Sequence, residues 1–203
     1  ENSEVKVKSE EGKQYKFGFD KIFDINTQQP DVYEFSAKPI LESVLEGFNG
    51  TILTYGQTSS GKTFTMEGVI GNSELEGIIP RTIKDTFEFI RNTTENIEFT
   101  VKISMVEIYM ERVKDIIDPS RKDLNIREDK ARGIFIEDLS EHYVGCEEEV
   151  LDLIKLGSEN RTTGETKMNA VSSRSHSIFA MTIHQNNMTT NVAKTGKLFL
   201  VDL

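Results

Sequence analysis

The fold is decided by one stretch of twelve residues: Tyr55, Gly56, Gln57, Thr58, Ser59, Ser60, Gly61, Lys62, Thr63, Phe64, Thr65 and Met66. Within it, residues 56–63 have the spacing G-x-x-x-x-G-K-T that is typical of a phosphate-binding loop. The apolar run at residues 51–55 can form the strand that leads into such a loop. The two glycines permit a backbone with positive φ, so that successive N–H groups converge on phosphate oxygens.

Two side chains in this loop have chemistry that suits a nucleotide. Lys62 supplies a positive charge, and the Thr63 hydroxyl can join the coordination of Mg²⁺. A helix that begins at Thr63 would also direct its N-terminus toward an anion. A chain of this length contains the pattern by chance on the order of once in a hundred, so an accidental glycine-rich turn stays open at this point.

Composition limits the class of protein. The chain has 203 residues, which is enough for one α/β domain, and a net charge of −10, which argues against nonspecific nucleic-acid binding. No apolar run approaches the ~20 residues that a membrane-spanning helix needs, so we expect no membrane insertion. Cys146 is the single cysteine, which indicates a thiol in a reducing compartment and therefore a cytoplasmic protein.

The first half of the chain predicts a hairpin, a helix and a strand before the loop. Alternating apolar residues on either side of residues 10–13 predict the hairpin. Residues 31–48 have a helical pattern, with Asp31 as N-cap and a kink at Pro39. The pair Asn49-Gly50 then predicts a turn into the strand.

The second half predicts more strands than helices. We expect a loop at residues 67–77, a helix at 79–90, a strand from 99 with a bulge near Val106, and short strands at 114–117 and 134–136. A helix follows Glu147 and ends near Gly157, and strands follow at 177–185 and 198–201. This order predicts the α/β class: a P-loop NTPase-type mixed central sheet flanked by helices, with the phosphate loop at the carboxyl end of a strand.

Two further polar features fit a nucleotide site. The run at residues 169–176, NAVSSRSH, gathers hydroxyls, an amide and an arginine just before a strand. By itself it is equally a capping and turn cluster. Asp202 directly follows an apolar strand, where NTPases of this loop class hold the Mg²⁺ shell with a carboxylate, although by itself a solvated strand-end aspartate is the favoured interpretation.

Taken together, these motifs resemble the motor domain of a kinesin. Residues 56–63 resemble the phosphate loop of that family, residues 169–176 its first switch, and residues 200–203 the start of its second switch. The resemblance covers nearly the whole chain and is closest to conventional, plus-end-directed kinesins. It implies a single partial motor domain over residues 1–203, without the first strand and without everything after the start of the second switch.

The resemblance implies a role for each matching residue. Lys62 and the loop amides would hold the β- and γ-phosphates of ATP, and Phe64 would stack on adenine. Ligands of Mg²⁺ would come from Thr63, Ser173 and Asp202. Hydrolysis would depend on four residues of the first switch: Asn169, Ser172, Ser173 and Arg174. The remaining members of the nucleotide-binding set are Gly56, Gln57, Thr58, Ser59, Ser60 and Gly61.

For the microtubule, the resemblance points to four basic residues as secondary contacts: Arg112, Arg127, Lys130 and Arg132. The segment from residue 110 to residue 132 has seven basic and six acidic residues, a net charge of +1. A solvated face of mixed charge is therefore an equally good interpretation.

The resemblance implies an ATP-driven motor of the microtubule cytoskeleton, a microtubule-stimulated ATPase that dimerises through a coiled coil outside this chain. We expect the stretch of 203 residues alone to be inactive, because the remaining motor segments are not in it. A non-hydrolysing nucleotide- or microtubule-binding module is the alternative. A small signalling GTPase fits poorly, because a guanine-reading N-K-x-D run is absent.

Overall fold

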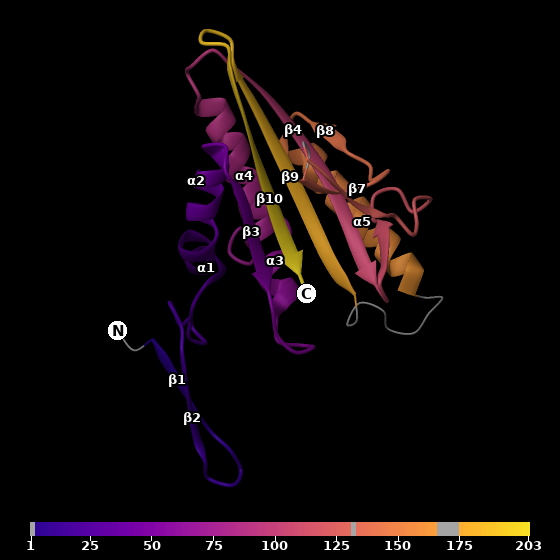
Figure 1. The fold of residues 1–203 in the computed structure, drawn as a ribbon. Helices are drawn as coiled ribbons and strands as arrows, with labels where there is room; N and C mark the ends of the chain where they lie inside the picture. The colour runs from indigo at the N-terminus through magenta and orange to yellow at the C-terminus, as the bar shows by residue number, and fades with distance from the viewer. Residues whose placement is uncertain (1–2, 131–132, 166–174) are drawn as a thin grey trace.

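The computed structural model describes residues 3–130, 133–165 and 175–203. Within them, helices pack against a six-stranded mixed sheet (Figure 1). The strands are β1 (Glu4–Lys8), β2 (Gln14–Gly18), β3 (Asn49–Thr54), β4 (Ile97–Tyr109), β5 (Arg112–Asp115), β6 (Ile126–Asp129), β7 (Gly133–Ile136), β8 (His142–Val144), β9 (His176–Asn187) and β10 (Val192–Asp202). The helices are α1 (Gln29–Ser36), α2 (Lys38–Leu45), α3 (Lys62–Met66), α4 (Ile78–Asn92) and α5 (Glu147–Glu165). The predicted α/β class is confirmed.

The main sheet has the order β3-β10-β9-β4-β5, with β8 paired to β4. Strands β3 and β10 run parallel, whereas β10, β9, β4 and β5 pair antiparallel along the order. The predicted mixed sheet is therefore confirmed. In the parallel pair, Asp202 lies opposite Thr54, so the carboxyl ends of both strands meet at one edge of the sheet.

The helices form a layer on one face of this sheet (Figure 1). Helix α2 packs on β3 and β10, and α4 contacts α1, α2 and α5. Buried side chains from both layers form one core that includes Leu41, Ile83, Ile154, Ile103, Met181 and Leu198. On β3 and β10, Leu53 and Phe199 remain 55% and 37% exposed.

Among the described helices, none has the length and apolar character that spanning a membrane requires.

The predicted helix at residues 31–48 is instead two helices, α1 and α2. The N-cap is Gln28 rather than Asp31, and Ala37 separates the helices. Pro39 explains the break, because a proline has no N–H for the helix and its ring clashes with the carbonyl four residues earlier. At the start of α2 the same residue is tolerated.

The predicted turn at Asn49-Gly50 is wrong, since both residues belong to β3. The Asn49 side chain accepts a hydrogen bond from the Lys197 N–H at 3.2 Å, which ties the strand start to β10. A Cβ on Gly50 would lie 2.5 Å from Ile40 Cγ2. This glycine therefore allows α2 to approach the sheet closely.

Two predictions in the middle of the chain are also wrong. Strand β4 has no bulge near Val106, because its pairing with β9 is unbroken from Ile97 to Ile108. Val106 and Glu107 are neighbours on opposite faces of this strand and both are buried, so the apolar alternation shifts here without a bulge. Gly157 lies inside α5, not at its end, and a Cβ on it would lie 2.9 Å from Ile116 Cγ2.

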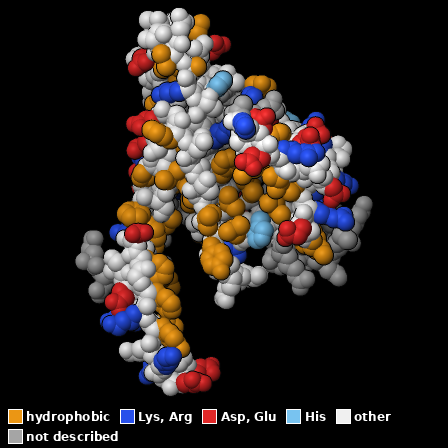
Figure 2. Space-filling view, viewed as in Figure 1, with side chains coloured by type: hydrophobic (Ala, Val, Ile, Leu, Met, Phe, Trp, Pro, Cys, Tyr) orange, Lys and Arg blue, Asp and Glu red, His pale blue; other side chains and the backbone are white. Residues whose placement is uncertain are grey.

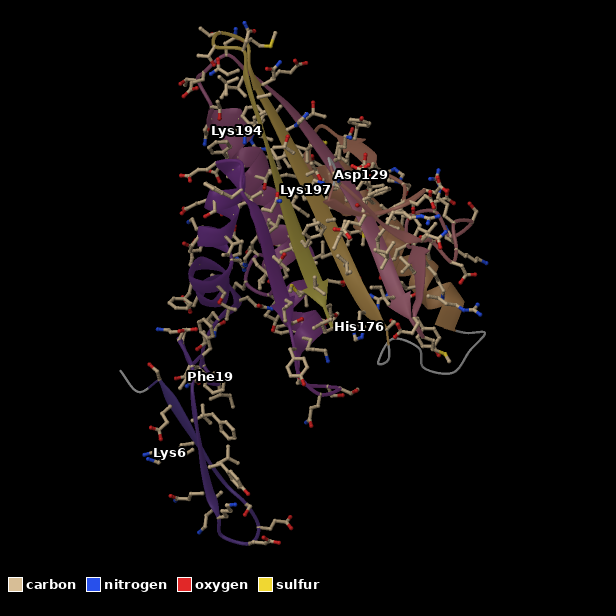
Figure 3. The ribbon with its side chains drawn as sticks, in the orientation of Figure 1. Lys6, Phe19, Asp129, His176, Lys194 and Lys197 are labelled. Carbon is tan, nitrogen blue, oxygen red and sulfur yellow. The ribbon has the colours of Figure 1, made fainter. Side chains whose placement is uncertain are left out.

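The predicted hairpin β1–β2 is confirmed and projects from the body of the molecule (Figure 1). Its apolar side chains gather along one side (Figure 2), and Phe17 is 49% exposed. Phe19 lies where the hairpin joins the body (Figure 3). A two-stranded ribbon of this kind contributes little independent stability.

Candidate functional site

The loop between β3 and α3 is tight on its inner side and open on its outer side. A Cβ on Gly56 would lie 2.6 Å from Ser60 Oγ, so a larger residue there would force the Ser60 side chain to move. Gly61 is the N-cap of α3 and has a φ of 90°, a left-handed conformation that favours glycine. A Cβ on Gly61 would meet no heavy atom within 4 Å. The loop therefore has open space where a phosphate group could approach its backbone.

Lys62 places its ammonium group over this loop. Its Nζ donates to the carbonyl oxygens of Gly56 at 3.0 Å and Gln57 at 3.2 Å. An ammonium group has three N–H donors, so one is available beyond these two contacts within the described residues. The positive charge of Lys62 is thus held next to the backbone of the loop, at Gly56 and Gln57.

Asp202 connects the loop to the end of β10. Its Oδ2 accepts a hydrogen bond from Thr63 Oγ1 at 2.5 Å, and its Oδ1 accepts one from Thr54 Oγ1 at 3.3 Å. The parallel pairing of β3 and β10 explains this contact, because it aligns the two carboxyl ends. The structure therefore brings together two of the three predicted Mg²⁺ ligands, Thr63 and Asp202.

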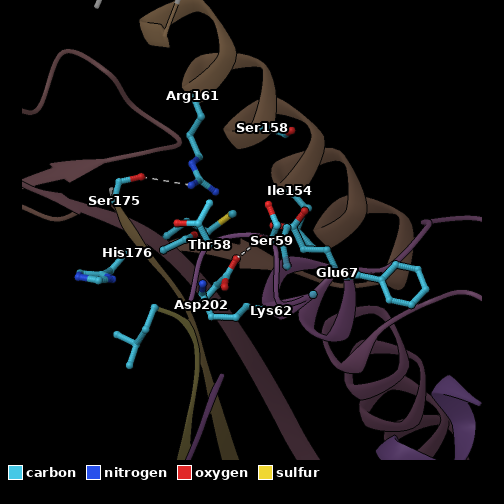
Figure 4. A pocket seen from close by; sticks show the side chains of 16 residues that line it. Thr58, Ser59, Lys62, Glu67, Ile154, Ser158, Arg161, Ser175, His176 and Asp202 are labelled. Atoms are coloured by element: carbon cyan, nitrogen blue, oxygen red, sulfur yellow. Dashed lines mark hydrogen bonds between the residues drawn. The ribbon is translucent and has the colours of Figure 1, made fainter. Parts of the chain in front are cut away.

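A cavity of about 440 Å³ opens beside these residues (Figure 4). The predicted residues Lys62, Thr63, Phe64 and Asp202 line it together with Thr58, Ser59 and Gly61. The opposite wall comes from α5 and from the start of β9, where His176 lies at the strand end (Figure 3). Ser60, Gln57 and Gly56 belong to the loop but not to the cavity wall.

Arg161 of α5 is a charged residue of this wall that the sequence did not predict. Its Nη2 donates to Ser175 Oγ at 3.4 Å (Figure 4). Its Nε lies 3.5 Å from Glu107 Oε1. The side chains of Arg161 and Glu107 are only 18% and 12% exposed. Arg161 therefore joins α5, β4 and the start of β9 beside the cavity. The sequence feature that could have indicated Arg161 is the polar stretch after Gly157, but we interpreted that stretch as following the end of the helix.

Glu67 also lines the cavity and was not predicted. Burial raises the pKa of its carboxyl group, and the negative charge of Asp202 raises it further, whereas the positive charge of Arg161 lowers it. Within the described part of the chain, burial thus opposes the charged form of Glu67 and Arg161 favours it.

Several predicted site residues lie outside the described residues. These are the hydrolysis residues Asn169, Ser172, Ser173 and Arg174, together with Arg132 of the microtubule set.

The other basic residues predicted to contact a microtubule lie in and around β5, β6 and β7. Arg112 pairs with Asp123 at 3.6 Å, and Arg127 pairs with Glu137 at 3.1 Å. Lys130 is exposed directly after β6. Each of the two arginines thus has a carboxylate partner that offsets part of its charge.

The residues that are present fit Mg²⁺ bound to a polyphosphate. Within the described part of the chain, no cluster of three or more His, Cys, Asp or Glu side chains could hold a metal ion by itself. Magnesium is commonly bound by one or two protein oxygens together with substrate phosphates and water. Thr63 and Asp202 supply such oxygens next to the charge of Lys62.

Comparisons with known proteins agree with this arrangement. A family model described as "Kinesin motor domain" matches residues 1–203. Kinesin-related protein 3 of Dictyostelium discoideum is 51% identical over 206 residues, which cover 100% of this chain and 17% of that protein. A kinesin heavy chain of Syncephalastrum racemosum is 51% identical over 195 residues, which cover 95% and 21%. The chain thus spans about a fifth of the length of these relatives.

Solved structures give the same result. The structure of a fast kinesin, described in terms of its ATPase mechanism and its interactions with microtubules, superposes with a TM-score of 0.91 and 44% sequence identity. The match covers 94% of this chain and 54% of that chain. Both the fold and its sequence are therefore shared.

Proposed function

This chain belongs to the kinesin motor-domain family, and we propose that it forms the nucleotide-binding part of an ATP-driven microtubule motor. One observation supports this proposal most strongly. The Thr63 hydroxyl lies 2.5 Å from the Asp202 carboxylate, although 139 residues separate them, and the charge of Lys62 lines the same cavity. This arrangement fits Mg-ATP.

Each residue has a defined task in this proposal. Lys62 and the loop N–H groups hold the β- and γ-phosphates, while Thr63 and Asp202 hold Mg²⁺ or its water shell. When bound, the metal ion would neutralise part of the charge on the phosphates. Phe64, which is 49% exposed beside the loop, offers an aromatic face to adenine. Catalysis in this class of reaction is mainly positioning and electrostatic stabilisation.

The family resemblance supports the rest of the hydrolysis machinery. Ser172 and Asn169 would position the attacking water, Ser173 would contact Mg²⁺ or its water shell, and Arg174 would pair with an acidic residue of the second switch. Changes in these switches on hydrolysis would then alter affinity for the track.

The proposed partner is the microtubule, with Arg112, Arg127, Lys130 and Arg132 as secondary contacts. We infer that these four basic residues meet an acidic surface of the track, where their charge would raise the rate of association. The proposal places the full-length protein in the cytoplasm, on the cytoskeleton, as a dimer through a coiled coil.

The direct test is ATP hydrolysis by the full-length protein with and without microtubules. We expect microtubules to stimulate the wild-type protein and Lys6→Ala equally, because Lys6 lies on the hairpin, away from the cavity (Figure 3). Lys62→Ala should lose at least about 99% of the stimulated rate. Binding of nucleotide or of microtubules without turnover would instead support a non-hydrolysing module, and binding of neither would contradict both functions.

A second test addresses the track contacts. Arg127→Ala should raise the microtubule concentration needed for half-maximal ATPase by about twofold to fivefold, with little change in the maximal rate. Lys155→Ala is the matched control, because Lys155 is exposed on α5. An equal effect of both substitutions would contradict a specific contact at Arg127.

A further inference from the structure

Gln29 makes a partly buried hydrogen bond to the helix that follows the phosphate loop. Its Nε2 donates to the carbonyl oxygen of Phe64 at 2.6 Å, across 35 residues of sequence. The Gln29 side chain is at the start of α1, and the residue is only 8% exposed. A buried amide at this place links α1 directly to α3.

The receiving carbonyl is one that α3 cannot satisfy by itself. Helix α3 has five residues, so its last carbonyls have few partners within the helix. The Gly68 N–H, which would pair with Phe64 in a longer helix, instead donates to the Thr63 carbonyl at 3.4 Å, and the Glu67 N–H donates to the same oxygen at 2.7 Å. Gln29 therefore acts as a distant cap for the C-terminal end of α3.

Helix α1, which contains Gln29, is itself held in place by contacts with α4. On the next turn of α1, the Tyr33 hydroxyl donates to Asp85 Oδ2 of α4 at 2.6 Å. The start of α4 is tied back to the end of α3, since the Gly77 N–H donates to the Glu67 carbonyl at 3.0 Å. Each of the helices α1, α3 and α4 is thus hydrogen-bonded to the other two, next to the phosphate loop.

We propose that Gln29 is a positioning residue for nucleotide binding, a role that rests on the proposed function. A helix of five residues is too short to be stable alone. Its N-terminal residues Lys62 and Thr63 nevertheless have to hold their places for the phosphates and Mg²⁺. By fixing the opposite end of α3, Gln29 keeps these two side chains in their binding positions.

The test is the affinity of the full-length protein for a fluorescent ADP analogue with Mg²⁺. Gln29→Met keeps the length of the side chain but removes its donor. We expect the Kd to rise about fivefold to tenfold, which is the effect expected when the free energy of one hydrogen bond no longer helps to hold α3 in its nucleotide-binding position.

Gln185→Met is the matched control. Gln185 is also buried, at 2% exposed, and its Nε2 donates to the carbonyl oxygen of Leu45 at 2.7 Å, at the end of α2. We expect its Kd to stay within twofold of the wild-type value whatever happens to its melting temperature. A Gln29→Met Kd within twofold of wild type, or an equal rise in both variants, would overturn the inference. Failure of the wild-type protein to bind the analogue would instead overturn the proposed function.

Should Gln29→Met not fold, hydrogen exchange in the wild-type protein still decides the matter. The inference requires that nucleotide slow the exchange of the Gln29 side-chain amide together with that of the Thr65 and Glu67 backbone amides in and next to α3, because the Gln29 hydrogen bond and the nucleotide would hold the same helix in place. A Gln29 amide whose exchange is indifferent to nucleotide would overturn the inference.

Discussion

At the scale of single residues, the site depends on the Asp202 carboxylate. It accepts hydrogen bonds from Thr54, the last residue of β3, and from Thr63 in the first turn of α3. These two hydroxyls bracket the phosphate loop, so one carboxylate fixes both ends of it. The same oxygens face the cavity where Mg²⁺ would be bound.

Asp202→Asn therefore tests the metal role of this residue. The substitution keeps the shape of the side chain but removes its negative charge. We expect the Mg²⁺-dependent ATPase rate to fall about 100-fold and the Mg²⁺ concentration for half-maximal rate to rise. Asp152→Asn, on the exposed side of α5, should behave as wild type. A normal Mg²⁺ titration for Asp202→Asn would contradict the assignment.

Arg161 and Glu107 provide a second test at this scale. Removing one partner of a mostly buried ion pair leaves an uncompensated charge, so we expect Arg161→Met to lower the free energy of unfolding by about 3 kcal/mol. Arg91→Met should cost less than about 1 kcal/mol, because the Arg91 side chain in its 2.9 Å pair with Glu147 is 62% exposed. Urea denaturation measures both. Equal losses would show that burial does not determine the strength of the Arg161 pair.

At the scale of elements, the sequence predicts those whose pattern is local. Helix α4 and strand β9 have strong apolar periods, and both were predicted to within a few residues. The errors at Gly50 and Gly157 have a common cause. Each glycine resembles a terminator in the sequence, whereas in the fold it allows a helix and the sheet to approach closely.

The residues of the candidate site also fall into two groups, those that a local pattern marks and those that no local pattern marks. Lys62, Thr63 and Asp202 could be predicted, because a motif and a strand end mark them locally. Gln29 and Arg161 could not, since their partners are 35 and 54 residues away in the sequence and no local pattern connects them.

Gly157→Val tests the close approach of α5 to the sheet. A Cβ there would press on Ile116 Cγ2 and, at 3.2 Å, on Met105 Cε, both of which belong to buried residues. We expect a loss of about 2 kcal/mol or more in the free energy of unfolding from this overpacking. Gly145→Val is the control, because the nearest atom to its Cβ is Glu149 Oε2 at 3.8 Å. A thermal or urea unfolding curve that is unchanged for Gly157→Val would show that the helix can move away freely.

At the scale of the whole molecule, stability resides in the core between the sheet and its helix layer. Phe179 on β9 is 2% exposed within this core, whereas Phe17 is on the projecting hairpin. The hairpin pairs with itself and stands apart from the main sheet (Figure 1). The same side chain thus occurs in two different environments.

Substituting alanine at both positions measures this difference. Phe179→Ala should cost about 3–5 kcal/mol, because it opens a cavity in a packed core. We expect Phe17→Ala to cost less than about 1 kcal/mol, since its ring is half exposed. Comparable losses, measured by urea denaturation of the full-length protein, would mean that the hairpin folds as part of the core.

The central claim is that the phosphate loop and the end of β10 bind one Mg-triphosphate between them. A crystal structure of the full-length motor region with Mg²⁺ and a non-hydrolysable ATP analogue tests it most directly. We predict that the phosphates lie against Lys62 and the loop N–H groups, and that Mg²⁺ or its water shell contacts both Thr63 and Asp202. A triphosphate bound elsewhere, or a metal ion that contacts neither Thr63 nor Asp202, would contradict this account.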